Sequence, residues 1–199
     1  MRPWPLVMLL WWGLAAGAPP SLPVCTEYNC DHPVTIRLSA DDWHGIERLF
    51  PAGQPAAAER TAIRRAIARL ETLAGALTGT WRDRPRNEGD PADPGQLDCV
   101  AESINSHTYL ELLAQRGLLR RHRVLPRESR NPWLFDFHWT AVIQELDSGR
   151  RYAVDSWYLA NGEPPYIQPL ESWRRGIEPA AETTTIAGDG TPAGATDAD

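Results

Sequence analysis

The chain has 199 residues, of which 42% are hydrophobic, 23% charged and 9% aromatic; this composition is typical of one globular domain and excludes a mainly disordered or collagen-like protein. The formal net charge of −6 disfavours attraction of the whole molecule to nucleic acid, so we expect no nucleic-acid partner. All 20 basic residues are arginine, which excludes catalysis by a lysine, whether as a Schiff base or in a serine–lysine pair.

The N-terminal segment has the pattern of a secretory signal. Arg2 is the only charged residue among the first 18, and the apolar run over 4–18 ends in small residues at 16–18, the pattern that a signal peptidase cuts. The run is too short for a membrane-spanning helix, which needs about 20 residues. We therefore expect residues 1–18 to be a cleaved signal peptide and the protein to be secreted or periplasmic, without stable membrane insertion after cleavage. An uncleaved anchor or a buried first helix is the alternative.

The three cysteines fall into a close pair and a single residue. Cys25 and Cys30 lie just beyond the signal, so an oxidising compartment favours a local disulfide between them. Half of a zinc site is the alternative, but no second pair of ligands stands at metal spacing, and we expect no metal site and no cofactor. The disulfide leaves Cys99 alone, either as a small buried residue or as a reactive thiol.

Three helices are predicted in the first half of the chain. Apolar residues recur every three or four positions and predict helices over 39–50, 56–77 and 98–116. The charged residues off the apolar stripe of the second helix, Glu71 among them, are interpreted as a solvated face. Residues 83–96 are rich in proline and glycine and are predicted to form a long loop of the kind that often serves a site.

The second half is predicted to be mostly β-structure. Residues 116–130 hold six arginines and are interpreted as a solvated loop, with a site for an anionic substrate or cell-surface polymer as the alternative. Residues 135–146 and 151–157 are rich in aromatic and β-branched side chains and predict a hairpin around a turn at 147–149. Residues 166–167 predict a short edge strand.

The order of these elements gives the domain organisation. Helices followed by strands predict one α+β domain over 25–178. Residues 179–199 consist mainly of alanine, threonine, glycine, proline and acidic residues, with no basic residue, and predict a disordered acidic tail.

Cys99 lies in a sequence context that favours a nucleophile. Asp98 is a good N-cap residue, so the sulfur of Cys99 is expected in the first turn of its helix, where the helix dipole favours a thiolate. The carboxylate of Asp98 opposes this effect unless backbone N–H groups occupy it. A basic partner is therefore needed, and of the five histidines only His138 lies in a predicted strand. Asp155 ends the returning strand and is the candidate to orient the imidazole of His138.

The geometry of the predicted hairpin decides whether this pair can form. A symmetric two-residue turn at 148–149 would pair residue 142 with Asp155 and leave His138 four residues away along the strand, roughly 13 Å. A bulge, or a turn centred nearer 146–147, is required to close this gap.

The order and spacing of these residues resemble the transglutaminase-like core of the papain-like superfamily, in its bacterial cysteine proteinase form. The segment QLDCVAE over 96–102 resembles the cysteine motif of that family, and HWTAV over 138–142 resembles its histidine strand. VDSW over 154–157 is similar to the Asn-Ser-Trp of papain, with aspartate in place of asparagine. The resemblance covers residues 96–157.

This resemblance implies a papain-like fold, in which the helix carrying the cysteine packs on a small antiparallel sheet. It also implies an exported cysteine hydrolase or acyltransferase that acts on an amide bond of a protein or peptide, including a glutamine side chain, through a thioacyl intermediate. Cys99 would attack the carbonyl carbon, His138 would act as base and then acid, and Asp155 would orient His138. The backbone N–H of Cys99, with Gln96 or Trp81 as a second donor, is expected to stabilise the oxyanion. A catalytically inactive binding module of the cell envelope is the alternative. Parts of the family use calcium, but no matching loop occurs here, so no calcium site is expected.

Overall fold

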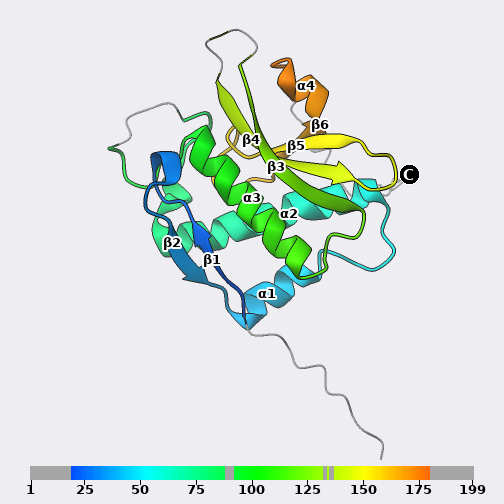
Figure 1. Ribbon diagram of the computed structural model, residues 1–199. Coiled ribbons are helices and arrows are strands. Elements are labelled where there is room, and N and C mark those ends of the chain that lie inside the picture. Colours follow the sequence, from blue (N-terminus) through cyan, green and yellow to red (C-terminus); the bar gives the residue numbers. More distant parts are fainter. Residues whose placement is uncertain (1–18, 88–91, 132–133, 135–136, 180–199) are drawn as a thin grey trace, which may run out of the picture.

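The computed structural model describes residues 19–87, 92–131, 134 and 137–179 of the chain. Within these residues, α-helices are combined with two antiparallel sheets, one of two strands and one of four, so the predicted α+β class is confirmed (Figure 1). The predicted signal segment over 1–18 lies outside the described residues, as does the predicted tail from residue 180 onward.

The three predicted helices form close to their predicted bounds. They are α1 (Ala40–Glu47), α2 (Ala56–Thr78) and α3 (Cys99–Gln115). The hydroxyl of Ser39 accepts a hydrogen bond from the N–H of Asp42 at 3.1 Å and caps the start of α1. Gly79 ends α2 in the left-handed conformation, with φ 90°. Three short elements were not predicted: α4 (Leu170–Arg174) and the 3₁₀ turns η1 (Tyr28–Cys30) and η2 (Thr80–Arg82).

The larger sheet has the strand order β3-β4-β5-β6 and is antiparallel throughout. Its strands are β3 (His122–Arg130), β4 (His138–Glu145), β5 (Arg151–Asp155) and β6 (Tyr166–Pro169). β4 and β5 form the predicted hairpin, and β6 is the predicted edge strand. A separate hairpin of β1 (Ser21–Val24) and β2 (Val34–Arg37) was not predicted. Leu22 and Val24 of β1 belong to the main core, so packed structure begins before residue 25.

The interpretation of 116–130 as a solvated loop is wrong for the residues of β3. This strand pairs with β4 along its length, with one irregularity after Leu125. Its arginines fit into a sheet because their stems and flat guanidinium groups pack on aromatic rings. Arg130, for example, is buried, with its guanidinium 4.9 Å from the ring centroid of Trp173 and Nη1 donating to the Trp173 carbonyl at 2.7 Å.

The main hydrophobic core lies between the helices and one face of the larger sheet. α3 packs directly on β3 and β4, and α2 lies against α3 (Figure 1). Ala141 and Ile143 of β4 belong to this core, whereas Val142 belongs to a smaller cluster with Trp173 of α4. Side chains alternate between the two faces of a strand, so His138 leaves the sheet on the same side as Val142, toward α4.

Candidate active site

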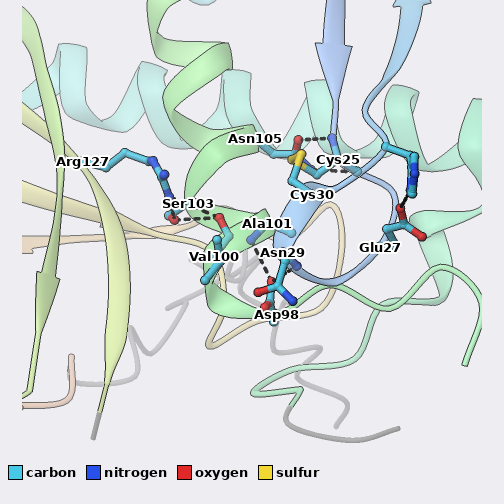
Figure 2. The surroundings of a disulfide bond; sticks show 11 residues. Cys25, Glu27, Asn29, Cys30, Asp98, Val100, Ala101, Ser103, Asn105 and Arg127 are labelled. Atoms are coloured by element: carbon cyan, nitrogen blue, oxygen red, sulfur yellow. Dashed lines mark hydrogen bonds and ion pairs between the residues drawn. A yellow bond between two sulfur atoms is a disulfide. The ribbon is translucent and has the colours of Figure 1, made fainter. Parts of the chain in front are cut away.

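Cys99 is the first residue of α3. Its N-cap residue Asp98 accepts hydrogen bonds at Oδ1 from the N–H groups of Ala101, at 2.8 Å, and Asn29, at 3.2 Å (Figure 2). Two backbone N–H groups therefore offset the carboxylate charge that would oppose a thiolate nearby. Cys99 is partly exposed and forms no disulfide, so it is a free thiol at a helix N-terminus.

The predicted disulfide between Cys25 and Cys30 is confirmed, and such a bond is typical of oxidising compartments. The two cysteines pack against Leu97 and Ala101 at the start of α3. The side-chain amide of Asn105 bonds both backbone groups of Cys25, accepting from its N–H at 2.7 Å and donating to its carbonyl at 3.2 Å (Figure 2). The disulfide loop is thus fastened to the first turns of α3.

The register of the β4–β5 hairpin differs from that of a two-residue turn. Val142 pairs with Ala153. The connecting loop runs over 146–149 and is closed by a hydrogen bond from the N–H of Glu145 to the carbonyl of Arg150 at 2.8 Å. The turn is therefore centred one residue earlier than 148–149, and this moves every cross-strand pair by two residues.

This register brings His138 and Asp155 together without a bulge in the hairpin. Ala141 pairs with Val154. Continuing the register places Asp155 opposite Thr140, with His138 diagonal to it on the same face. His138 Nε2 lies 2.8 Å from Asp155 Oδ2, and both side chains are buried.

The pKa of His138 is the resultant of burial and of two neighbouring groups, Asp155 and Cys99. Burial acts to lower this pKa, but the charge and hydrogen bond of Asp155, followed by the hydrogen bond and charge of Cys99, outweigh burial and raise it to about 9. Because Nε2 bonds Asp155, Nδ1 is the ring nitrogen left for the thiol. The imidazole is therefore held as a cation at neutral pH, with the carboxylate of Asp155 at Nε2.

Aromatic rings enclose the imidazole of His138. The ring centroids of Trp157, Tyr158 and Trp173 lie 4.7, 5.7 and 5.8 Å from its own. Trp173 also donates from Nε1 to Oδ2 of Asp155 at 2.7 Å, so this carboxylate oxygen accepts two hydrogen bonds. The sequence favours Trp173 as a core residue, with a wall of a substrate cleft as the alternative, and does not predict its bond to Asp155, because that bond depends on a strand register that the sequence does not specify. The rings fix the plane of the imidazole and keep water away from the pair.

Gln96 and Trp81, the two side chains predicted as oxyanion donors, make other contacts. Gln96 is buried, donates from Nε2 to the carbonyl of Arg82 at 2.7 Å and accepts at Oε1 from Asn87 at 2.6 Å. Trp81 is 61% exposed, and the guanidinium of Arg82 lies 4.6 Å from its ring centroid. The N–H of Cys99, in contrast, lies in the first helical turn, where N–H groups lack acceptors within the helix.

Three buried carboxylates, those of Glu71, Asp83 and Glu102, lie on the elements around the start of α3. Burial, and to a smaller extent the charge of Asp83, raises the pKa of Glu71 to about 7. The hydrogen bonds from Ser156 and from the N–H of Gly162 act in the opposite direction but are outweighed. Burial, followed by the charges of Glu71 and Asp83, raises the pKa of Glu102 well above its usual range. These groups therefore share protons at neutral pH rather than all being ionised.

The interpretation of Glu71 as part of a solvated face is wrong, because this residue is only 3% exposed. Glu71 stands four positions after Ile67, so it lies on the buried face of α2. Its Oε1 accepts a hydrogen bond from Ser156, the residue that follows Asp155, at 2.7 Å. A carboxyl group on an apolar stripe was the signal for this network in the sequence.

Among the residues that the structure describes, no group of three or more histidine, cysteine, aspartate or glutamate side chains could hold a metal ion. In the same part of the chain, no helix is long and apolar enough to cross a membrane. No model of a protein family matches the chain, and no curated protein or solved structure is significantly similar to it. The chemistry of the site is therefore the basis for assigning a function.

Proposed function

We propose that this protein is an exported, transglutaminase-like cysteine hydrolase that cleaves an amide bond in a protein or peptide. The observation that supports this function most is the buried pair of His138 and Asp155, in which Asp155 holds Nε2 of the ring and Cys99 is among the groups that raise the pKa of His138. Nucleophilic catalysis by cysteine requires a thiol, an imidazole and an orienting group in this order. The cysteine-bearing helix on a small antiparallel sheet supports a papain-like core.

In the acylation step, the thiolate of Cys99 attacks the amide carbonyl carbon, an S–C bond forms, and the carbonyl oxygen becomes an oxyanion. The backbone N–H of Cys99 is the donor placed to bind this oxyanion. The imidazolium of His138 then gives its proton to the leaving nitrogen as the C–N bond breaks. A thioacyl enzyme and a free amine result.

In the deacylation step, water attacks the thioester carbonyl while neutral His138 accepts a proton from it. The C–S bond breaks, a carboxylic acid leaves, and the thiolate of Cys99 faces the imidazolium of His138 again. Asp155 orients the ring throughout. An amine in place of water would give acyl transfer, but water is the default acceptor.

Alkylation of Cys99 by iodoacetamide tests this function. The other two cysteines are held in a disulfide, so Cys99 is the thiol that reacts. Fast alkylation is expected below pH 7, because an imidazolium beside the sulfur keeps it as thiolate. The variant His138→Ala should slow the reaction below pH 7 by about tenfold or more, whereas His44→Ala, in the exposed part of α1, should leave it unchanged.

If Cys99 instead reacts fast only when the pH approaches the pKa of a free thiol, about 8.5, the proposed enzyme function is wrong. The same conclusion follows if Cys99 reacts only after the protein is unfolded. The inactive binding module then becomes the better explanation. Hydrolysis of a panel of amide and ester substrates, compared with the variant Cys99→Ser, would measure the activity itself.

A further inference from the structure

Arg127 of β3 places a cation beside the start of α3. Its Nη1 donates to Ser103 Oγ at 2.8 Å and to the carbonyl of Val100 at 3.4 Å (Figure 2). Val100 is the residue after Cys99, so the guanidinium lies against the turn that carries the sulfur. Figure 2 shows the side chain of Arg127 reaching from its strand toward this turn.

No carboxylate of the described residues pairs with Arg127. The adjacent Glu128 pairs instead with Arg174 at 2.6 Å and Arg151 at 3.5 Å. Burial lowers the pKa of Arg127, and the charge of Cys99 is the influence that acts to raise it. A partly buried guanidinium without a carboxylate partner is therefore held against the first turn of α3, although a desolvated charge is costly unless an anion pairs with it.

The plane of this guanidinium is fixed by an aromatic ring. The central carbon of the Arg127 guanidinium lies 4.8 Å from the ring centroid of Trp139, and Phe137 packs edge-on against Trp139 with ring centroids 6.0 Å apart. Phe137 is 57% exposed. The nitrogens that are not bonded to α3 thus form a preoriented fork beside an open apolar surface, a geometry that matches a carboxylate.

We propose that Arg127 binds a carboxylate of the substrate next to the scissile bond, so that the enzyme selects acidic peptides. This inference rests on the proposed function and names its substrate class. The carboxylate is either an aspartate or glutamate side chain or a free C-terminus, within one residue of the amide that Cys99 attacks. Arg127 acts in binding, and the bond-breaking steps described above are unchanged.

The experiment compares two alkylating reagents that differ in charge. The rates at which iodoacetate and iodoacetamide alkylate Cys99 are measured at pH 7, and their ratio is divided by the same ratio for free cysteine. We expect wild type to favour iodoacetate by about tenfold on this scale, and the variant Arg127→Gln to lose most of that preference. Arg127→Lys, which keeps the charge without the fork, should retain part of it and covers the case in which the glutamine variant fails to fold.

The matched control is Arg123→Gln on the same strand. Arg123 is exposed and bonds Gln144 at 2.8 Å, at the end of β3 away from the pair between Arg130 and His138. This variant removes the same charge from the molecule and should keep the preference of wild type. If both variants lose the preference for iodoacetate equally, the preference comes from the long-range electrostatic field of the protein. A binding role for Arg127 would then be overturned.

Two pairs of peptide reagents distinguish the sources of the carboxylate. Iodoacetyl-glycine is compared with iodoacetyl-glycinamide, and iodoacetyl-glutamate amide with iodoacetyl-glutamine amide. If Cys99 prefers iodoacetyl-glycine over its amide and this preference depends on Arg127, the carboxylate is a free C-terminus. If it prefers the glutamate reagent over the glutamine reagent in the same way, the carboxylate is an acidic side chain. If Cys99 reacts fast with every reagent but shows no preference that depends on Arg127, the substrate class is wrong and the hydrolase stands. If Cys99 reacts only after unfolding, the proposed function itself fails.

Discussion

At the scale of single residues, Asp155 determines the pH range in which His138 keeps its proton. Its carboxylate lies 2.8 Å from His138 Nε2 in a buried pair, where low polarity strengthens the attraction of charges. The proposed acylation step requires a proton on His138, because the leaving nitrogen must be protonated as it departs. The pKa of about 9 for His138 therefore predicts that acylation slows as the pH rises through this value.

The variant Asp155→Asn is expected to move this alkaline limit to lower pH. Removing the negative charge takes away the larger of the two influences that raise the pKa of His138, so the imidazolium loses its proton earlier. The alkaline limb of kcat/KM should shift down by about one unit or more, and NMR titration of the imidazole should show the same shift. The control is Asp147→Asn, in the exposed turn of the same hairpin. An unchanged limb in the Asp155 variant would show that Asp155 does not set the protonation of His138.

The sequence proposes Cys99, His138 and Asp155 as candidates but does not place them relative to one another. The residue types and the predicted helix start depend on local chemistry, which a sequence carries. The distance between His138 and Asp155 depends on the loop over 146–149, because moving a turn by one residue moves the cross-strand pairs by two. The bond from Trp173 to Asp155 is not predicted for the same reason, since it arises from packing between α4 and the sheet.

At the scale of elements, the start of α3 is held from several sides. The disulfide loop contacts it in two places: the N–H of Asn29 bonds Asp98, and the N–H of Cys25 bonds the side chain of Asn105 in α3. Strand β3 contacts it through Arg127. The segment before α3 is held by Asp83, which accepts a hydrogen bond from the N–H of Leu97 at 2.8 Å. These contacts fix the direction in which the sulfur of Cys99 points, which catalysis requires to within a fraction of an ångström.

Replacing both Cys25 and Cys30 by serine tests the contribution of the disulfide loop. The loop is short, so the free energy of unfolding should fall by only about 2 kcal/mol. Asp98 should also lose the Asn29 N–H, and its less compensated charge should slow the alkylation of Cys99 several-fold at pH 6. Urea unfolding and the alkylation rate measure the two effects. A loss of stability with no change in the reactivity of Cys99 would limit the disulfide to a structural role.

How well each helix or strand could be predicted depended on how strong its local sequence pattern is. α2 and α3 are long, and their apolar residues recur at helical spacing, so tertiary contacts and local preference agree. β3 was missed because its arginines resemble a solvated segment until Trp139 and Trp173 are known to lie beside them. The hairpin of β1 and β2 contains only four residues per strand and depends on contacts with α3 that are distant in sequence.

At the scale of the whole molecule, buried groups whose pKa is raised on folding make the free energy of unfolding fall as the pH rises. Glu102 and Asp83 act in the same direction as Glu71 and His138, and the pH range is defined for the latter two. The pKa of Glu71 rises from 4.5 to about 7 on folding, so its contribution is fully present below pH 4.5 and is lost as the pH rises to about 7. The pKa of His138 rises from 6.5 to about 9, so its contribution is present below pH 6.5 and is lost as the pH rises through about 9. The free energy of unfolding should therefore fall in two successive windows between pH 5 and 9.

The variant Glu71→Gln is expected to remove the first window and keep the second. Glutamine fits the site because its carbonyl can accept from the Gly162 N–H while its amide donates to Ser156, whose hydroxyl can turn to donate to Ser106. Between pH 4.5 and 7, wild type should lose about 3 kcal/mol more unfolding free energy than the variant, as measured by urea unfolding across this range. The control is Glu111→Gln, on a partly exposed face of α3, which should keep the wild-type dependence. An equal fall in the Glu71 variant would place the proton on Glu102 or Asp83 instead, because both carboxyl groups belong to the same buried network and both have raised pKa values.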